Sequence, residues 1–185
     1  MMYISKGVVK AAFDKESMTV NHRGADVRLD RTQAPIWLAG QYMAQEFKWP
    51  NLTVNELIDL GVVVMTEEDG PLGRYRLLTD CVIAPAENKL FRKPIKISER
   101  NIWEWISKAG IRPTVAELIC LEQNQIEPAP ELLGEENRQN LVSAIYSSET
   151  IGDNILEGLM EHSTFRDDVV DTIYGLLKKK RIILI

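Results

Sequence analysis

The stretch Thr53-Val54-Asn55-Glu56-Leu57-Ile58-Asp59-Leu60-Gly61-Val62-Val63-Val64-Met65 decides the fold class of this chain. A Thr followed three residues later by Glu is typical of a capping box, in which each side chain bonds a backbone amide at a helix start. Gly61 suits the position just after a helix. The β-branched run 62–65 predicts a strand. A short helix followed directly by a strand indicates an α+β domain.

The flanking segments extend this pattern. Upstream, apolar residues recur at helical spacing and predict a helix over 31–48, with Pro35 in its first turn. Downstream, 67–73 is rich in turn residues, and the partial alternation of 74–79 predicts a returning strand. Helix, capped helix, strand, turn and strand resemble the winged-helix/helix-turn-helix superfold over 31–84. This resemblance implies either a DNA binder or a protein adaptor.

The rest of the chain completes a helix-rich α+β prediction with two domains. Residues 1–30 alternate between short apolar runs and turns, which predicts a β-meander in a domain over 1–84. A linker over 85–97 precedes a helical domain over 98–185, whose C-terminal unit is again helix-turn-helix-like. Its capping box is Thr114 with Glu117.

The second domain is predicted to end in a strand. Five helices are expected before it, at 98–110, from the capping box at Thr114, and at 137–147, 152–161 and 166–179. Ile182–Ile185 then forms the strand, with 95–97 as a candidate partner. The hexapeptides 53–58 and 114–119 match at five of six positions. This match is explained equally well by duplication or by one helix-start pattern used twice.

Composition excludes several classes of protein. The formal net charge is −5, which disfavours a surface that binds nucleic acid throughout. No apolar run approaches the length of a membrane span, and the N-terminus lacks the features of a signal peptide, so we expect a cytoplasmic protein without membrane contact. Cys81 and Cys120 are expected to be buried free thiols. With two histidines in the chain, they cannot form a closed zinc site, and we expect no metal and no cofactor.

Two groups of residues are the candidates for binding. Residues 89–112 carry seven cations against two carboxylates in an acidic chain, with tryptophans interleaved. Together with two arginines of the expected wing, they are candidates for contact with an anionic partner. The cations are Arg74, Arg76, Lys89, Arg92, Lys93, Lys96, Arg100, Lys108 and Arg112, and the candidate interface aromatics are Trp49, Trp103 and Trp105. An ordinary solvated helix face, with the tryptophans in the core, is the alternative explanation.

These observations rank three alternative classes of function. Catalytic motifs are lacking, and the expected recognition helices carry carboxylates that DNA phosphates would repel. We therefore expect a non-enzymatic regulatory or adaptor protein that uses winged-helix-like domains for protein–protein interaction, including homodimer formation. A DNA-binding transcriptional regulator is the alternative, and an enzyme is the least favoured.

Overall fold

The computed structural model describes residues 1–14, 17–86, 94–146 and 152–185, and this part of the chain is a mixed α+β structure. The chain divides into two compact units. Unit 1 comprises Met1–Cys81 together with Ile183–Ile185, and unit 2 comprises Val82–Ile182. No local signal in the sequence indicates that the last three residues belong with the N-terminal unit.

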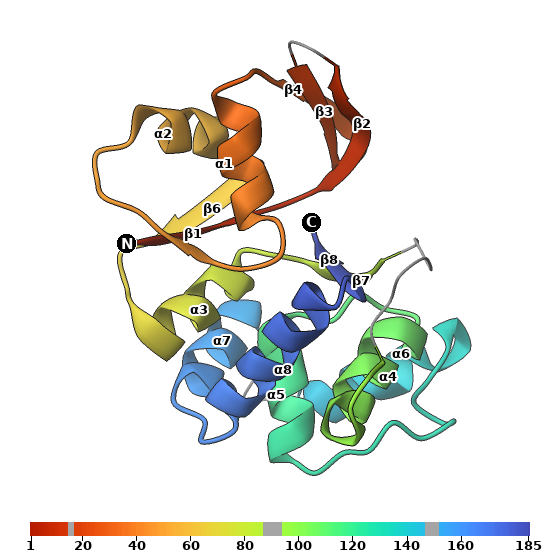
Figure 1. Cartoon of the computed structure of the whole chain (residues 1–185). Coiled ribbons are helices and arrows are strands. Elements are labelled where there is room, and N and C mark those ends of the chain that lie inside the picture. Colours follow the sequence, from red (N-terminus) through yellow and green to blue (C-terminus); the bar gives the residue numbers. More distant parts are fainter. Residues whose placement is uncertain (15–16, 87–93, 147–151) are drawn as a thin grey trace. The chain divides into compact units, whose positions relative to one another are not determined.

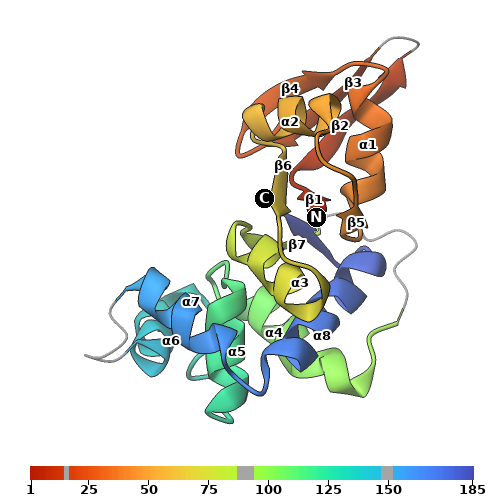
Figure 2. The ribbon, with the colours of Figure 1, turned by 90° about the vertical axis from the view of Figure 1, so that its left-hand side faces the viewer.

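An antiparallel meander forms one sheet of unit 1, as predicted. Its strands are β2 (Val8–Asp14), β3 (Ser17–His22) and β4 (Ala25–Leu29) (Figure 2). Arg23 and Gly24 join β3 to β4 with φ of 50° and 85°. Positive φ at both residues of a two-residue loop is the type I′ geometry, which matches the twist of the paired strands.

The N-terminal strand belongs to a second sheet. The order of this sheet is β5–β1–β6, in which β1 (Met2–Ser5) pairs antiparallel with both β5 (Gln45–Glu46) and β6 (Val63–Thr66). All four residues of β1 are buried, since the strand is flanked on both sides. The predicted strand at 62–65 is confirmed as β6.

The first helix is shorter than predicted. α1 spans Gln33–Gly40 instead of 31–48. After α1 the chain forms β5, where Gln45 lies opposite Tyr3 of β1, and Phe47 then donates its amide proton to the backbone of residue 1. Pairing with a buried strand satisfies backbone groups, and here it outweighs the helical spacing of the apolar residues.

The second helix exists as predicted but has a different cap. α2 spans Leu52–Asp59, and its N-cap is Asn51, whose side chain accepts a hydrogen bond from the Val54 amide. The predicted capping box at Thr53 is therefore wrong, because Thr53 is already inside the helix. Gly61 follows the helix with a φ of 73°, as its predicted role requires.

The expected second wing strand is a helix. α3 spans Gly70–Thr79, so the strand predicted at 74–79 is wrong. Pro71 lies in its first turn, where the missing N–H costs nothing. Tyr75 and Leu77 are both buried, and α3 packs on β1 and β6. Their alternation therefore arises from burial on a helix rather than from a strand.

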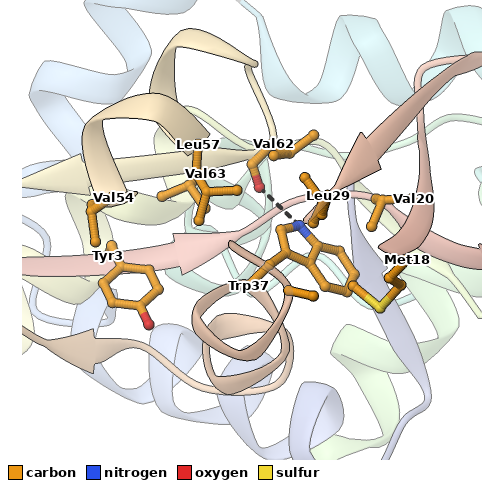
Figure 3. Packing of buried hydrophobic residues seen from close by; sticks show 10 residues of the cluster. Tyr3, Met18, Val20, Leu29, Trp37, Val54, Leu57, Val62 and Val63 are labelled. Atoms are coloured by element: carbon orange, nitrogen blue, oxygen red, sulfur yellow. Dashed lines mark hydrogen bonds between the residues drawn. The ribbon is translucent and has the colours of Figure 1, made fainter. Parts of the chain in front are cut away.

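Trp37 of α1 fills the core of unit 1. Its side chain is 0% exposed and is surrounded by residues from both sheets and α2 (Figure 3). The indole Nε1 lies 3.2 Å from the carbonyl oxygens of both Lys6 and Val62. The Ser5 hydroxyl donates to the Trp37 carbonyl at 2.7 Å. These bonds fix α1 against the central strand.

Unit 2 is mostly helical, and the five predicted helices are confirmed, with small changes at the ends of those whose bounds were predicted. Its elements are β7 (Ile83–Pro85), η1 (Ile97–Glu99), α4 (Arg100–Lys108), α5 (Val115–Gln123), η2 (Glu135–Asn137), α6 (Arg138–Ile145), α7 (Asp153–Glu161) and α8 (Arg166–Lys178).

Helix α5 is the centre of unit 2 and packs against α6, α7 and α8 (Figure 1). Residues 115–121 are all buried. The predicted capping box is confirmed: the Thr114 amide donates to Glu117 Oε2 at 2.7 Å, and the Glu117 amide donates to Thr114 Oγ1 at 3.2 Å. The matching hexapeptides therefore start their helices differently, because Asn51 caps α2.

The predicted C-terminal strand is confirmed as β8 (Ile182–Leu184), but its suggested partner is wrong. Ile97 begins the 3-10 helix η1, and β7 is the neighbour of β8. The Ala86 amide donates to the Arg181 carbonyl at 2.8 Å beside this pairing. Within the described ranges, no helix is both long and apolar enough to cross a bilayer.

Candidate functional site

Exposed large apolar side chains gather in one segment of unit 1. We use the name 38–60 surface for the exposed side chains of residues 38–60, defined by their position in the chain, and its exposed large apolar residues are Leu38, Met43, Trp49, Leu52 and Leu60. Trp49 is 49% exposed and Leu52 is 79% exposed. Apolar area left exposed in this way is available for contact with a partner.

A chain of aromatic rings links this surface to the buried sheet. The ring of Tyr3, on β1, meets the ring of Phe47 edge-on with centroids 5.7 Å apart. Phe47 meets Trp49 in the same manner at 6.3 Å. Edge-to-face pairs of this kind are attractive beyond the area they bury. Trp49 is therefore held by the fold although half of its surface is exposed.

Leu52 is exposed because of its position in α2. Val54 and Leu57, three residues apart, form the buried stripe of the helix, and Leu52 is the first helical residue outside it. The Asn51 cap fixes the backbone at this point. The geometry thus presents Leu52 on a rigid helix start rather than on a loop.

The 38–60 surface is acidic as well as apolar. Its ionisable residues are Glu46, Glu56 and Asp59 against the single cation Lys48. All four are exposed. A partner with apolar anchors and neighbouring cations complements this composition.

The described cations of the predicted basic stretch are spread over α4 and the segments on either side of it. Lys96 precedes η1, Arg100 and Lys108 lie at opposite ends of α4, and Arg112 follows it. Arg100 and Lys108 are eight positions apart in the helix, a rise of about 12 Å. Lys108 pairs with Glu104 at 3.6 Å. Three further members, Lys89, Arg92 and Lys93, lie outside the described residues.

The arginines expected on a wing are on helix α3. Arg74 and Arg76 both interact with other groups of the protein. Because α3 replaces the predicted strand, the described structure has no wing at this position that could carry the two arginines to DNA phosphates.

The tryptophans divide between core and surface. Trp105, a predicted interface residue, is 0% exposed, as is Trp37, so neither ring can contact a partner. Trp103 is partly buried, and the Arg181 guanidinium lies 5.8 Å from its ring centroid. Trp49 is the predicted interface aromatic that the fold leaves open.

Side chains that could ligate a metal are not grouped in the described ranges. No group of three or more His, Cys, Asp or Glu residues there could hold a metal ion. Burial raises the pKa of Cys81 to about 12, and its thiol donates to the Leu77 carbonyl at 3.1 Å. Burial also raises the pKa of Cys120. Burial lowers the pKa of His22, and the positive charge of Lys6 lowers it further.

Both thiols are expected to be unreactive in the folded protein, because the thiolate is the reacting species and both groups are buried. Ellman's reagent at about pH 8 should label neither cysteine until guanidinium unfolds the chain. A variant with an exposed thiol, Ser143→Cys, supplies the positive control. Fast labelling of Cys81 or Cys120 in the folded protein would show that burial does not protect them.

Sequence reasoning identified Trp49 but missed Leu52, Leu38, Met43 and Leu60. Each is apolar and adjacent to a helical stripe, so the sequence alone places it in a core. The signal for Leu52 is that it precedes the buried 54–57 stripe by two residues, a spacing that does not share a helix face.

The chain matches no protein-family model, no curated protein and no solved structure.

Proposed function

We propose that this protein is a non-enzymatic adaptor that binds another protein through the 38–60 surface of unit 1. The observation that supports this most strongly is the exposure of Trp49 and Leu52, three residues apart in the chain and both fixed by neighbouring contacts. Tryptophan is among the residues that contribute most to protein–protein binding when it becomes buried.

The free energy available from burying Trp49 and Leu52 favours a role in binding over a structural role. Burying an exposed leucine or tryptophan side chain in an interface contributes about 1.5–3 kcal/mol each. In the free protein Leu52 is 79% exposed and Trp49 is 49% exposed, so both can still bury apolar area on binding. A rigid, pre-positioned apolar surface also loses less conformational entropy on binding than a mobile loop does.

The partner should present an apolar anchor next to basic side chains, because the surface has three carboxylates and one lysine. The same carboxylates disfavour the DNA-binding alternative, since Glu56 and Asp59 of α2 are exposed where a recognition helix would need neutral or basic residues. A second copy of this chain is a partner that the experiment below detects separately.

Selection from a displayed random-peptide library tests the proposal without a known partner. Selected peptides are expected to contain aromatic or aliphatic anchors with nearby Lys or Arg. Trp49→Ser should weaken their binding at least about 30-fold, which corresponds to a loss of about 2 kcal/mol. Leu52→Ser should weaken it about tenfold.

The matched control is Ile97→Ser in unit 2, where the isoleucine is 87% exposed. This variant removes a comparable apolar side chain and should leave peptide affinity unchanged. Equal affinity of the selected peptides for wild type, Trp49→Ser and Leu52→Ser would contradict the proposal. Binding of duplex DNA is measured in parallel to detect nucleic-acid binding at this surface. Sedimentation of the free protein detects self-association.

A further inference from the structure

Unit 2 contains a pocket of about 580 Å³ that is separate from the 38–60 surface. Its walls are the end of β7, the end of α4 and the loop that follows, the first turns of α5 and α6, and Glu135 at the start of η2. Pockets of roughly 300–1,000 Å³ are the size that encloses small organic ligands.

The backbone holds one wall of this pocket in place. Gly110, which follows α4, has a φ of 69°, and a Cβ there would lie 2.6 Å from the backbone nitrogen of Glu135. Next to this contact the Gly134 amide donates to the Lys108 carbonyl at 2.8 Å. Only a glycine permits this approach of the two loops. The pocket is therefore formed by the fold itself.

Two arginines line the pocket from different elements. Arg112 lies in the loop after α4, and Arg138 begins α6. Within the described part of the chain, neither guanidinium has a hydrogen bond or ion pair. Each guanidinium offers a planar set of donors that matches a carboxylate or phosphate group.

The pocket also contains two carboxylates, of which one is engaged by the protein. Glu117 is buried, and its two oxygens accept from the Thr114 amide at 2.7 Å and the Tyr146 hydroxyl at 3.0 Å. Glu135 is exposed at the pocket edge. Two arginines against two carboxylates leave the walls without net charge, which favours a singly charged ligand group over a doubly charged phosphate.

The remaining lining is apolar except for one buried hydroxyl. Ile106, Ile111 and Val142 supply the apolar walls. Ser107 Oγ is buried and has no hydrogen-bond partner in the described protein. A buried hydroxyl without a partner is unfavourable, and an oxygen atom of a ligand would satisfy it.

We propose that this pocket binds a small organic carboxylate with an apolar body. The carboxylate accepts hydrogen bonds from Arg112 and Arg138, and the apolar body contacts the Ile106, Ile111 and Val142 side chains. This site is independent of the proposed adaptor function, because it lies wholly in unit 2 and shares no residue with the 38–60 surface.

Three probes with one apolar body and different head groups test the assignment: 4-phenylbutanoate, 4-phenylbutanamide and 4-phenylbutyl phosphate. Each is titrated into the full chain labelled with ¹⁵N, and the amide signals of Gly110, Ile111 and Gly134 are followed by NMR. The butanoate is expected to shift these signals saturably. The uncharged amide should bind at least about tenfold more weakly, since it loses the charge-assisted hydrogen bonds.

Variants separate charge from shape. Arg112→Gln and Arg138→Gln should each weaken butanoate binding at least fivefold, in the range expected for loss of a charged hydrogen bond. Arg100→Gln removes an exposed arginine of α4 outside the pocket and should have no effect. Val142→Trp fills the pocket without changing charge and should abolish binding, with the far-ultraviolet circular dichroism of the folded protein retained.

Several results would overturn the proposal. These are the absence of saturable shifts at the pocket amides, equal affinity for butanoate and butanamide, and wild-type butanoate affinity in both arginine variants. Tighter binding of the phosphate would overturn the choice of a carboxylate. Because the readout is at Gly110 and Gly134, failure here leaves the peptide-binding test of the 38–60 surface unaffected.

Discussion

Replacing Trp37 by alanine is expected to destabilise unit 1 by about 3–5 kcal/mol, the range for removing a buried tryptophan from a packed core. The ring is 0% exposed and contacts both sheets and α2. Its loss also removes the indole donor from the carbonyls of Lys6 and Val62. Chemical unfolding followed by circular dichroism measures this change in the free energy of unfolding.

Two controls make this result interpretable. Trp49→Ala removes the same side chain from an exposed position and should change the free energy of unfolding by under about 1 kcal/mol. Trp37→Phe keeps an aromatic ring and should cost about 1–2 kcal/mol for the lost donor and the smaller volume. Similar losses for Trp37→Ala and Trp49→Ala would show that the core of unit 1 is not centred on Trp37.

Glu99→Gln is expected to destabilise unit 2 by about 3 kcal/mol, because it leaves the partly buried ammonium of Lys179 without its carboxylate. Lys179 Nζ lies 2.7 Å from Glu99 Oε1, and the two side chains are 14% and 8% exposed. Glu99 Oε2 also accepts from the Lys96 amide at 2.8 Å. The pair joins α8 to the start of α4, 80 residues apart in sequence.

A double variant separates loss of the pair from loss of packing. Replacing both residues by methionine removes the two charges together and should recover much of the stability lost in Glu99→Gln. Gly175 lies beside this pair, where a Cβ would be 3.2 Å from Glu99 Oε1. If the double variant is less stable than Glu99→Gln, the electrostatic explanation is wrong.

The same pair makes the protein sensitive to acid. Burial raises the pKa of Glu99, but the hydrogen bonds from Lys179 and from the Lys96 amide outweigh it, and the net pKa is below the ordinary value. A carboxyl whose pKa is lowered by folding contributes stability above its unfolded pKa of about 4.3, and this is lost as pH falls through the folded pKa. Between about pH 5 and 3 the wild type should therefore lose more stability than Glu99→Gln.

The sequence predicts those elements whose local signals agree with their burial. Gly61 follows α2, the β-branched run at 63–66 is β6, and the Thr114 capping box begins α5. In each case a local hydrogen bond or a backbone preference determines the element. The meander over 8–29 belongs to the same group, because its hairpin turn is fixed by Arg23 and Gly24.

Where tertiary contacts decide the outcome, the sequence prediction fails. Residues 74–79 alternate like a strand but form α3, because they pack on the sheet of β1 and β6. The helix expected over 31–48 ends at Gly40, where a Cβ would lie 2.5 Å from Ser5 Oγ. Both results depend on β1, a strand far away in sequence.

The candidate surfaces could be predicted only in part from the sequence, because tertiary contacts decide which side chains are exposed. Trp49 and Trp105 are indistinguishable as residue types, yet one is half exposed and the other is fully buried. Leu52 and the pocket lining became evident once the helix boundaries and the approach of Gly110 to Glu135 were known. Arg112 was expected in an anionic contact, but that it lines a pocket together with Arg138 becomes evident only in the folded unit.

The proposal that the 38–60 surface binds a protein is tested most directly by photo-crosslinking in the cells that make this protein. A benzophenone amino acid is placed at Leu52 and, as the control, at Ile97, the two most exposed large apolar residues of the described chain. We expect a discrete crosslinked protein at Leu52, lost when Trp49→Ser is added, and no such product at Ile97. No product at Leu52, or the same products at both positions, would contradict it.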